Sequence, residues 1–393
     1  MARRLTKMSK IGGRIAAIRG HHVGFAPETP LGNAAGFIRR RDFLLLEVEA
    51  ADGTIGWGEV GASPWAAAAL IRHGLAKQVI GQPAMEYGRI FETLLGLRGY
   101  DQRGASMMAI SAIDMALHDI AARQQGISVA ALHGGALRPR VPAYASGPFM
   151  VEGPDPYAGF APDIDAYLLR GYRAIKPRAG AGPAADGAMA EALRRQVGPD
   201  IALMVDFNRG VTARAGLASA QLMEPAGLLW IEEPTVPEDL PGYRMLAQTS
   251  PIGIAGGEAL GSLAAFREFL ETGAVTVLQP DLSVCGGYSG YTRVAALCAA
   301  WDLPVMPHVF GTLVNFHASL QAAALTPARR GGAAMPYPFV ECDVSGNPLQ
   351  TLLGEPPLDA DGMMSLPDGP GAGFELRSEQ LAPWHVETWS IAA

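Results

Sequence analysis

Side chains capable of acid–base or metal chemistry recur along this chain at nearly even intervals. Asp206, Glu232, Glu258, Asp281 and His308 follow one another with gaps of 23 to 27 residues. In a βα barrel of about 250 residues, one strand–helix unit takes roughly 25 residues or slightly more, and the carboxyl ends of all strands point to one face. The spacing therefore predicts a βα barrel that carries these five side chains on one rim.

Eight short apolar segments in the second part of the chain match this prediction. They cover residues 141–146, 174–178, 202–207, 228–232, 252–256, 275–279, 304–307 and 338–341. Segments rich in Ala and Leu lie between them, for example 263–270 and 295–300. Strands that alternate with helices indicate a parallel sheet buried on both faces. We expect residues 179–187, which are rich in Ala and Gly, to form a surface loop.

The first part of the chain has a different pattern. Residues 43–49 and 56–59, separated by Asp52-Gly53, predict a β-hairpin. A helix is predicted after it from an apolar stripe at spacings of three and four residues, with Gly126 as its end. The stripe consists of Ile110, Ile113, Leu117 and Ile120.

These patterns divide the chain into three parts. Residues 1–138 are expected to form an α+β capping domain, and residues 139–350 a TIM-like barrel. Residues 351–393 contain turn clusters and no further strand–helix unit, so we expect them to pack back on the cap.

Composition excludes several classes of partner. With 393 residues, of which 49% are hydrophobic, the chain can bury a sizeable core. A net charge of −7 and no long basic run argue against nucleic acid. No uncharged apolar stretch of about 18 residues occurs, so we expect no membrane span. Residues 1–10 are basic without an apolar run, so we expect no signal peptide. Three widely separated cysteines fit a reducing cytoplasm.

Three of the evenly spaced residues are carboxylates that follow consecutive strands. Asp206, Glu232 and Glu258 would repel one another if they converged, unless a cation joined them. Carboxylate oxygens suit Mg²⁺, and the lack of a nearby His or Cys cluster argues against zinc. Single acids in such places are usually surface residues, but three in consecutive units predict a metal site. Whether Glu233 also contributes stays open.

The remaining two residues predict a general base. His308 follows the seventh strand and Asp281 the sixth, so the carboxylate can orient the imidazole and raise its basicity. Lys176 and Arg178 are two residues apart on the second strand and share a face. Glu341 ends the eighth strand and, if protonated, could donate a hydrogen bond to a substrate oxygen that gains negative charge.

Together these motifs resemble the enolase superfamily and, within it, the mandelate racemase subgroup. The resemblance covers nearly the whole chain and includes Ala109–Asp119 and Ala131–Gly135 in the predicted cap. In the barrel it rests on Lys176-x-Arg178, Asp206-x-Asn208, Ile231–Pro234, Gly257-Glu258, Pro280-Asp281 with Gly286-Gly287, Pro307-His308 and Glu341.

The resemblance implies an α/β fold: a modified (β/α)7β TIM barrel with an α+β N-terminal cap, completed by the C-terminal tail. It implies one essential Mg²⁺ held by Asp206, Glu232 and Glu258, and abstraction of the proton α to a carboxylate. It assigns the base to the His308–Asp281 dyad and the electrophilic acid to Glu341. Lys176, Arg178 and Asn208 are expected to contact a small carboxylate substrate, and a homo-oligomer (a dimer or an octamer) is expected.

One position departs from the racemase pattern and shifts the predicted reaction. Arg178 stands where the racemase has a lysine base, and arginine stays protonated at ordinary pH. Racemisation needs a base on each face of the α-carbon, so one dependable base favours dehydration of an acid sugar to a 2-keto-3-deoxy acid.

Two alternatives remain open at the sequence level. A racemase, epimerase or cycloisomerase of a hydroxy acid or sugar lactone would use the same metal site. A non-catalytic binding protein on this scaffold is the other alternative. Substrate choice is expected to lie in cap loops near Phe25 and Trp65, which could close the site against water.

Overall fold

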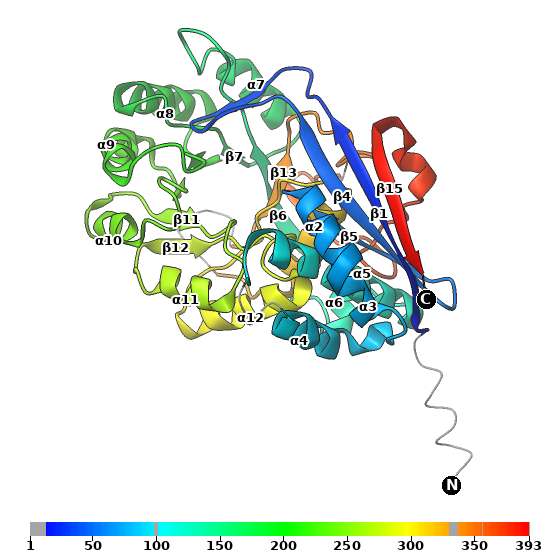
Figure 1. Ribbon diagram of the computed structural model, residues 1–393. Coiled ribbons are helices and arrows are strands. Elements are labelled where there is room, and N and C mark those ends of the chain that lie inside the picture. Colours follow the sequence, from blue (N-terminus) through cyan, green and yellow to red (C-terminus); the bar gives the residue numbers. More distant parts are fainter. Residues whose placement is uncertain (1–12, 98–100, 330–336, 356, 393) are drawn as a thin grey trace, which may run out of the picture.

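The computed structural model describes residues 13–97, 101–329, 337–355 and 357–392. In Figure 1 an N-terminal sheet with its helices lies beside a larger array in which strands and helices alternate. The basic segment 1–10, where we expect no signal peptide, lies outside the described residues.

An antiparallel sheet in the order β15-β1-β4-β5, whose first strand is the C-terminal β15 (His385–Ala392), forms the centre of the N-terminal part. The predicted hairpin is confirmed, because β4 and β5 pair in register from Leu44–Val60 to Glu49–Ile55. Between them Gly53 adopts a positive φ of 83°, which a glycine accepts without steric cost. The strands of this part are β1 (Ile15–Phe25), β2 (Leu31–Asn33), β3 (Gly36–Ile38), β4 (Arg41–Ala50) and β5 (Ile55–Val60).

The predicted long helix is confirmed as α5 (Gly104–Gln125), which ends at Gly126 with a φ of 67°. By length and composition α5 could cross a membrane, but 89% of its apolar stretch is buried within the protein, as in a core helix. Its neighbours are α2 (Pro64–Leu70), η2 (Ile71–Leu75), α3 (Ala76–Val79), η3 (Ala84–Glu86), α4 (Tyr87–Leu97) and α6 (Val129–Leu132).

Short parallel strands alternate with helices in the second part. They pair in the order β13-β6-β7-β8 and β9-β10-β11-β12, and a parallel bridge between Arg178 and Asp206 joins the two sets. The strands are β6 (Arg140–Ser146), β7 (Ala174–Lys176), β8 (Ala202–Leu203), β9 (Val205–Asp206), β10 (Ile231–Glu232), β11 (Ile254–Gly256), β12 (Val275–Leu278) and β13 (Val340–Asp343). The helices are α7 (Phe160–Leu169), α8 (Pro183–Val197), α9 (Ala213–Met223), η4 (Glu224–Ala226), α10 (Leu240–Thr249), α11 (Leu263–Leu270), α12 (Gly287–Ala300) and α13 (Leu313–Leu325).

All eight predicted strand segments contribute to one buried apolar cluster. Trp230 lies within it, with its ring centroid 6.2 Å from that of Tyr144 and 6.3 Å from that of Phe339. A residue from every segment meets there because alternate strand residues point to the same side. The cluster consists of Tyr144, Ala174, Met204, Trp230, Ala255, Val277, Met306, Tyr337 and Phe339. The eight segments therefore share one core, and the predicted site residues lie on or just after them.

Two local predictions need correction. The segment 304–307 forms only a bridge at Val305, with another just beyond it at His308, because Pro304 and Pro307 have no N–H to donate to a ladder. The predicted loop 179–187 is wrong in its second half, because α8 begins at Pro183. There the buried Asp186 accepts hydrogen bonds from Gly180, Ala181 and Ser219, which fixes this turn.

The last part of the chain contacts both of the others. β14 (Met363–Ser365) pairs with β6, whereas β15 (His385–Ala392) pairs antiparallel with β1 along most of its length. A 3-10 helix, η5 (Ser378–Trp384), lies between them. In Figure 1 β15 forms the outer edge of the N-terminal sheet.

Candidate active site

Eight of the nine predicted site residues lie at or just beyond the carboxyl ends of parallel strands, whereas Glu341, predicted to end the eighth strand, lies within it because β13 continues to Asp343. Asp206 ends β9 and Glu232 ends β10, and the register places these two opposite each other. A parallel bridge likewise pairs Asp281 with His308. The other members are Lys176 at the end of β7, Arg178 and Asn208 just beyond strands, Glu258 after β11 and Glu341 within β13. The structure thus brings all nine predicted residues to one rim.

Lys176 lies fully buried among three carboxylates. Its Nζ is 2.5 Å from Glu232 Oε1, 2.9 Å from Glu341 Oε1 and 3.9 Å from Asp206 Oδ2. Burial opposes the charge on the lysine, but these carboxylates outweigh it and raise the Lys176 pKa. Lys176 is therefore a fixed positive charge here, where a free amine would be needed for a base.

Arg178 and Asn208 hold Asp206. The Arg178 guanidinium donates to Asp206 Oδ2 at 2.6 Å and to Ser146 Oγ at 3.2 Å. Asn208 donates from its backbone N–H and its side-chain amide, at 2.7 and 2.8 Å. Asn208 reaches both oxygens because it adopts a φ of 44°, a left-handed conformation that asparagine tolerates.

His308 has one ring nitrogen bound to a carboxylate and the other directed into the rim. Its Nδ1 lies 2.7 Å from Asp281 Oδ2. Asp281 is itself held by hydrogen bonds from the Ser283 N–H, the Ser283 hydroxyl and the Asn315 amide. The His308 Nε2 lies 3.1 Å from Glu258 Oε2. An aspartate on Nδ1 leaves Nε2 as the atom that can take or give a proton.

Because several carboxylates lie close together at the site, the pKa values of Glu232 and Glu341 shift in opposite directions. Burial, with added repulsion from Asp206, Glu341 and Glu258, raises the pKa of Glu232 to about 7, although Lys176 opposes this. Burial opposes ionisation of Glu341, but Lys176 and His308 outweigh it and lower its pKa. Glu341 Oε2 accepts the Val309 N–H at 2.9 Å. In this arrangement Glu341 is an ionised acceptor, so a donor role would require Lys176 to move away.

Burial lowers the pKa of His308, but Glu258, Glu341 and Asp281 together raise it well above its ordinary value. An imidazole acts as a base only in its neutral form. Neutralising part of the negative charge of Glu258 would lower the pKa of His308 and so favour its neutral form.

The donor set fits a hard divalent cation in its chemistry. Three carboxylates with oxygen donors and no thiolate suit Mg²⁺, and Asp206 and Glu232 already converge on one positive centre, the Lys176 ammonium. Among the described residues, no three His, Cys, Asp or Glu side chains already form a cluster that could hold an ion. In this structure the carboxylates contact basic side chains: Glu232 and Asp206 lie beside Lys176, and Glu258 lies beside His308.

Several residues at the site were missed by the sequence analysis. Glu232 Oε2 accepts hydrogen bonds from Gln279 Nε2 at 2.7 Å and from Trp230 Nε1 at 3.1 Å. Arg209 lies 3.0 Å from Glu233 and 3.7 Å from Glu258, which places Glu233 beside the rim. Gln279 directly precedes the Pro280-Asp281 motif, and Arg209 directly follows Asn208. This adjacency to predicted site residues could have identified both from the sequence.

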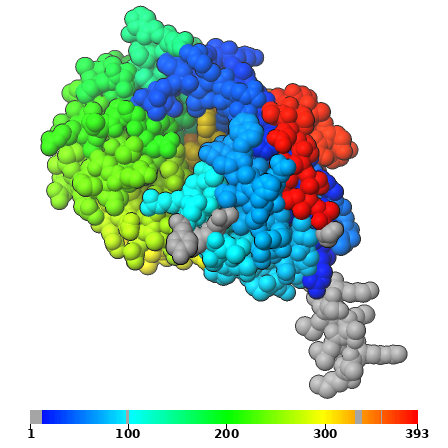
Figure 2. Space-filling view, in the orientation of Figure 1, coloured from blue at the N-terminus to red at the C-terminus, as the bar shows by residue number. Residues whose placement is uncertain are grey.

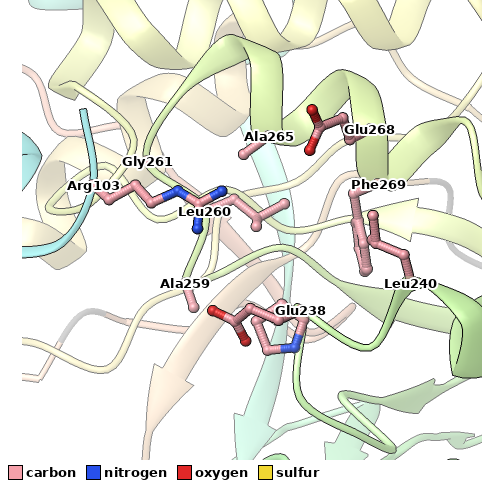
Figure 3. A pocket seen from close by; sticks show the side chains of 10 residues that line it. Arg103, Glu238, Leu240, Ala259, Leu260, Gly261, Ala265, Glu268 and Phe269 are labelled. Atoms are coloured by element: carbon pink, nitrogen blue, oxygen red, sulfur yellow. The ribbon is translucent and has the colours of Figure 1, made fainter. Parts of the chain in front are cut away.

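The surface is hollowed where the blue N-terminal strands meet the green helices, and gold segments lie at the bottom of the hollow (Figure 2). A separate pocket of about 240 Å³ lies between the loops that follow β10 and β11. Arg103 reaches into this pocket near Leu260 and Glu238 (Figure 3). None of the nine predicted site residues lines it.

Trp65, a predicted specificity residue, is half exposed, and its ring stacks on that of His22 with the centroids 5.5 Å apart.

Comparison with known proteins agrees with this geometry. Residues 18–134 match the model of the mandelate racemase / muconate lactonizing enzyme N-terminal domain, and residues 160–381 match the enolase C-terminal domain-like model. D-galactarolactone cycloisomerase from Agrobacterium fabrum is 35% identical over 95% of this chain and 99% of its own. D-gluconate dehydratase from Thermoproteus tenax is 32% identical over 73% of this chain and 58% of its own.

Solved structures agree as well. The crystal structure of a racemase from Streptomyces coelicolor A3(2) with bound magnesium superimposes with a TM-score of 0.84 at 29% identity, covering 95% of this chain and 98% of that one. Both domain models, the relatives and this likeness point the same way: the chain belongs to the enolase superfamily, in its mandelate racemase subgroup, and is an enzyme of the dehydratase or isomerase type.

Proposed function

We propose that this enzyme removes the proton α to the carboxylate of an acid sugar and then expels a leaving group from the β-carbon. The observation that supports this most strongly is the His308–Asp281 pair, whose Nε2 points into the carboxylate rim and lies 3.1 Å from Glu258. The second basic position is Arg178, which cannot act as a base. One dependable base suits β-elimination better than racemisation.

Asp206, Glu232 and Glu258 are the residues we propose to hold Mg²⁺. When bound, the ion supplies positive charge that stabilises the developing enolate and so makes the α-proton easier to remove. The strands that carry these ligands are proposed to close into the modified (β/α)7β barrel, with residues 1–138 as the cap. The buried cluster to which all eight segments contribute supports a closed barrel.

The proton transfers are assigned to His308. Its Nε2 takes the α-proton, while Asp281 on Nδ1 stabilises the imidazolium that forms. In dehydration, hydroxide leaves the β-carbon, takes the proton from His308 and departs as water. The resulting enol then tautomerises to a 2-keto-3-deoxy acid. Lys176 and Arg178 remain cationic and offset the substrate carboxylate, and Asn208 is placed to contact a substrate oxygen.

Cycloisomerisation is the second candidate, and the 35% identity to a galactarolactone cycloisomerase favours it. It uses the same first step, but the leaving group is a ring oxygen, so the ring opens and no water is released. A sugar lactone that carries a free carboxylate is the substrate class this would require. Both candidates share the same residues and the same α-proton transfer.

A screen of acid sugars and their lactones with Mg²⁺ tests this proposal and separates the two candidates. A keto acid that reacts with semicarbazide is expected in both cases. Mass spectrometry then shows a loss of 18 mass units for dehydration and no mass change for ring opening. Interconversion of epimers without a keto product would overturn the proposal.

Two further predictions concern the molecule in the cell. We expect it in the cytoplasm, because Cys285, Cys298 and Cys342 are all buried free thiols. A homo-oligomer, dimer or octamer, stays a prediction that light scattering on the purified protein would test.

A further inference from the structure

Glu59 belongs to the Gly56-Trp-Gly-Glu59 run of the cap strand β5, yet its carboxylate is used outside the cap. A Cβ on Gly58 would lie 1.8 Å from the Ala112 carbonyl oxygen, and one on Gly56 2.3 Å from that of Ala116. Only glycine therefore lets this face of β5 lie against α5. Since alternate strand residues point to opposite faces, Trp57 and Glu59 point away from α5 and towards the barrel.

The Glu59 carboxylate binds the first turn of α13. It accepts the Thr312 N–H at 2.9 Å, the Thr312 hydroxyl at 2.6 Å and the Asn315 N–H at 2.9 Å. Gly311 permits this approach, because a Cβ there would lie 2.3 Å from Glu59 Oε1. The first N–H groups of a helix need acceptors, and a negative charge at that end is favourable.

This helix start is connected directly to the dyad. The side-chain amide of Asn315, whose backbone N–H binds Glu59, donates to Asp281 Oδ1 at 3.2 Å. The other oxygen of Asp281 holds His308. His308 also lies only a short loop before Thr312 in the chain. Glu59 therefore fixes the end of the loop that follows His308 and, through Asn315, the carboxylate that holds the ring.

The helix that follows Asp281 is held by the cap in a similar way. At the start of α12, the Gly286 N–H donates to Ser111 Oγ at 2.8 Å and the Ser289 N–H donates to Asp114 Oδ2 at 3.0 Å. Ser111 and Asp114 both belong to α5. The two helices that follow the dyad residues thus both begin on acceptors supplied by the cap.

We propose that Glu59 is a positioning residue for the His308–Asp281 dyad, acting through Thr312 and Asn315, so that the cap sets the rate of proton abstraction as well as closing the site. The proposal rests on the proposed function, because it takes His308 as the base. It predicts that disturbing Glu59 lowers kcat while substrate affinity is largely kept.

The test compares Glu59→Gln with Asp119→Asn. A glutamine offers one acceptor oxygen to three donors, and its NH₂ group would face another donor. Asp119 is a matched control: it is equally buried in the cap and accepts the Trp57 and Ala372 N–H groups and the Arg123 guanidinium, but none of these hydrogen bonds reaches α13 or the dyad. We expect Glu59→Gln to lower kcat about 10- to 100-fold with little change in KM, as for a displaced catalytic group. Asp119→Asn is expected to lower the Tm and leave kcat unchanged.

A double-mutant cycle with Asn315→Ala locates the connection and avoids dependence on one variant that could fold poorly. If Glu59 acts through Asn315, the double variant loses little more kcat than the more damaged single variant, because coupled residues are not additive. Additive losses, or equal losses of kcat in Glu59→Gln and Asp119→Asn, would overturn the proposal.

Hydrogen exchange supplies a readout that needs no substrate. Peptides covering residues 309–316 should exchange faster in Glu59→Gln than in the wild type, and at the wild-type rate in Asp119→Asn. If the wild type turns over no acid sugar, the proposed function fails. Selective acceleration in Glu59→Gln would still support the positioning role, whereas equal exchange in the three proteins would overturn it.

Discussion

At the scale of single residues, the reaction depends on which basic side chains can give up their own proton and then act as a base. Lys176 is held between Glu232 and Glu341, and Arg178 is bound to Asp206, so both stay charged. His308 directs its second ring nitrogen, the one not bound to Asp281, into the rim. The sequence predicted these residues because each follows an apolar strand at a regular interval. It could not predict Glu59, because its partners lie about 253 residues away in the chain.

Replacing Arg178 with lysine should add a second group able to exchange protons. A lysine can lose its proton once a bound cation neutralises its carboxylate neighbours, whereas an arginine stays charged. We expect Arg178→Lys to lower the elimination rate roughly tenfold or more, because charge-assisted hydrogen bonds to Asp206 are weakened. It should also produce the α-epimer of the substrate, which NMR of the reaction mixture would detect. A variant that loses elimination without forming any epimer would show that this position has no access to the α-carbon.

At the scale of elements, the ends of strands and helices decide what the sequence could predict. Periodicity located the hairpin β4–β5, the helix α5 and most of the parallel strands. It failed at 304–307, where prolines limit the ladder to bridges, and at 183–187, where an Ala- and Gly-rich segment starts α8. Loops and helix starts depend on long-range hydrogen bonds, such as the one that Asp186 accepts from Ser219, 33 residues away, and these leave no local pattern.

A buried ion pair connects the start of β4 to the end of β13. Arg41 donates to Asp343 at 2.5 Å and to the Phe310 carbonyl oxygen at 3.0 Å. Removing one member leaves the other charge buried and unpaired, so Arg41→Met should lower the free energy of unfolding by about 3–5 kcal/mol. Urea unfolding at neutral pH measures this. The double variant Arg41→Met/Asp343→Leu should recover much of the loss. A single variant as stable as the wild type would contradict this account.

The same pair predicts a pH dependence. Burial raises the pKa of Asp343, but Arg41 and Ser345 outweigh it, and the folded pKa lies below the ordinary value of 3.8. A carboxyl with a lowered folded pKa contributes stability above its unfolded pKa and loses it as pH falls through the folded value. The wild type should therefore lose this stability below about pH 4. Its stability advantage over the double variant should shrink in that range, which unfolding curves at several pH values would show.

At the scale of the whole molecule, metal binding should stabilise the fold. A ligand at 100 times its Kd adds about 2.7 kcal/mol, which raises the Tm of a chain of this length by about 3 °C. Differential scanning fluorimetry with and without Mg²⁺ measures the shift. Glu258→Gln removes one proposed ligand and should abolish most of it. A shift of equal size in that variant would place the ion elsewhere.

The central claim is that one base, His308, starts a β-elimination. Proton NMR in D₂O, with Mg²⁺ and a substrate found by the acid-sugar screen, tests it most directly in the wild type and in His308→Asn. We predict that the wild type forms a keto acid without returning α-deuterated epimer. His308→Asn should lose both product formation and α-proton removal by about 10²- to 10⁴-fold while staying folded. Full activity in His308→Asn, or α-deuteration with no keto acid in the wild type, would contradict the account.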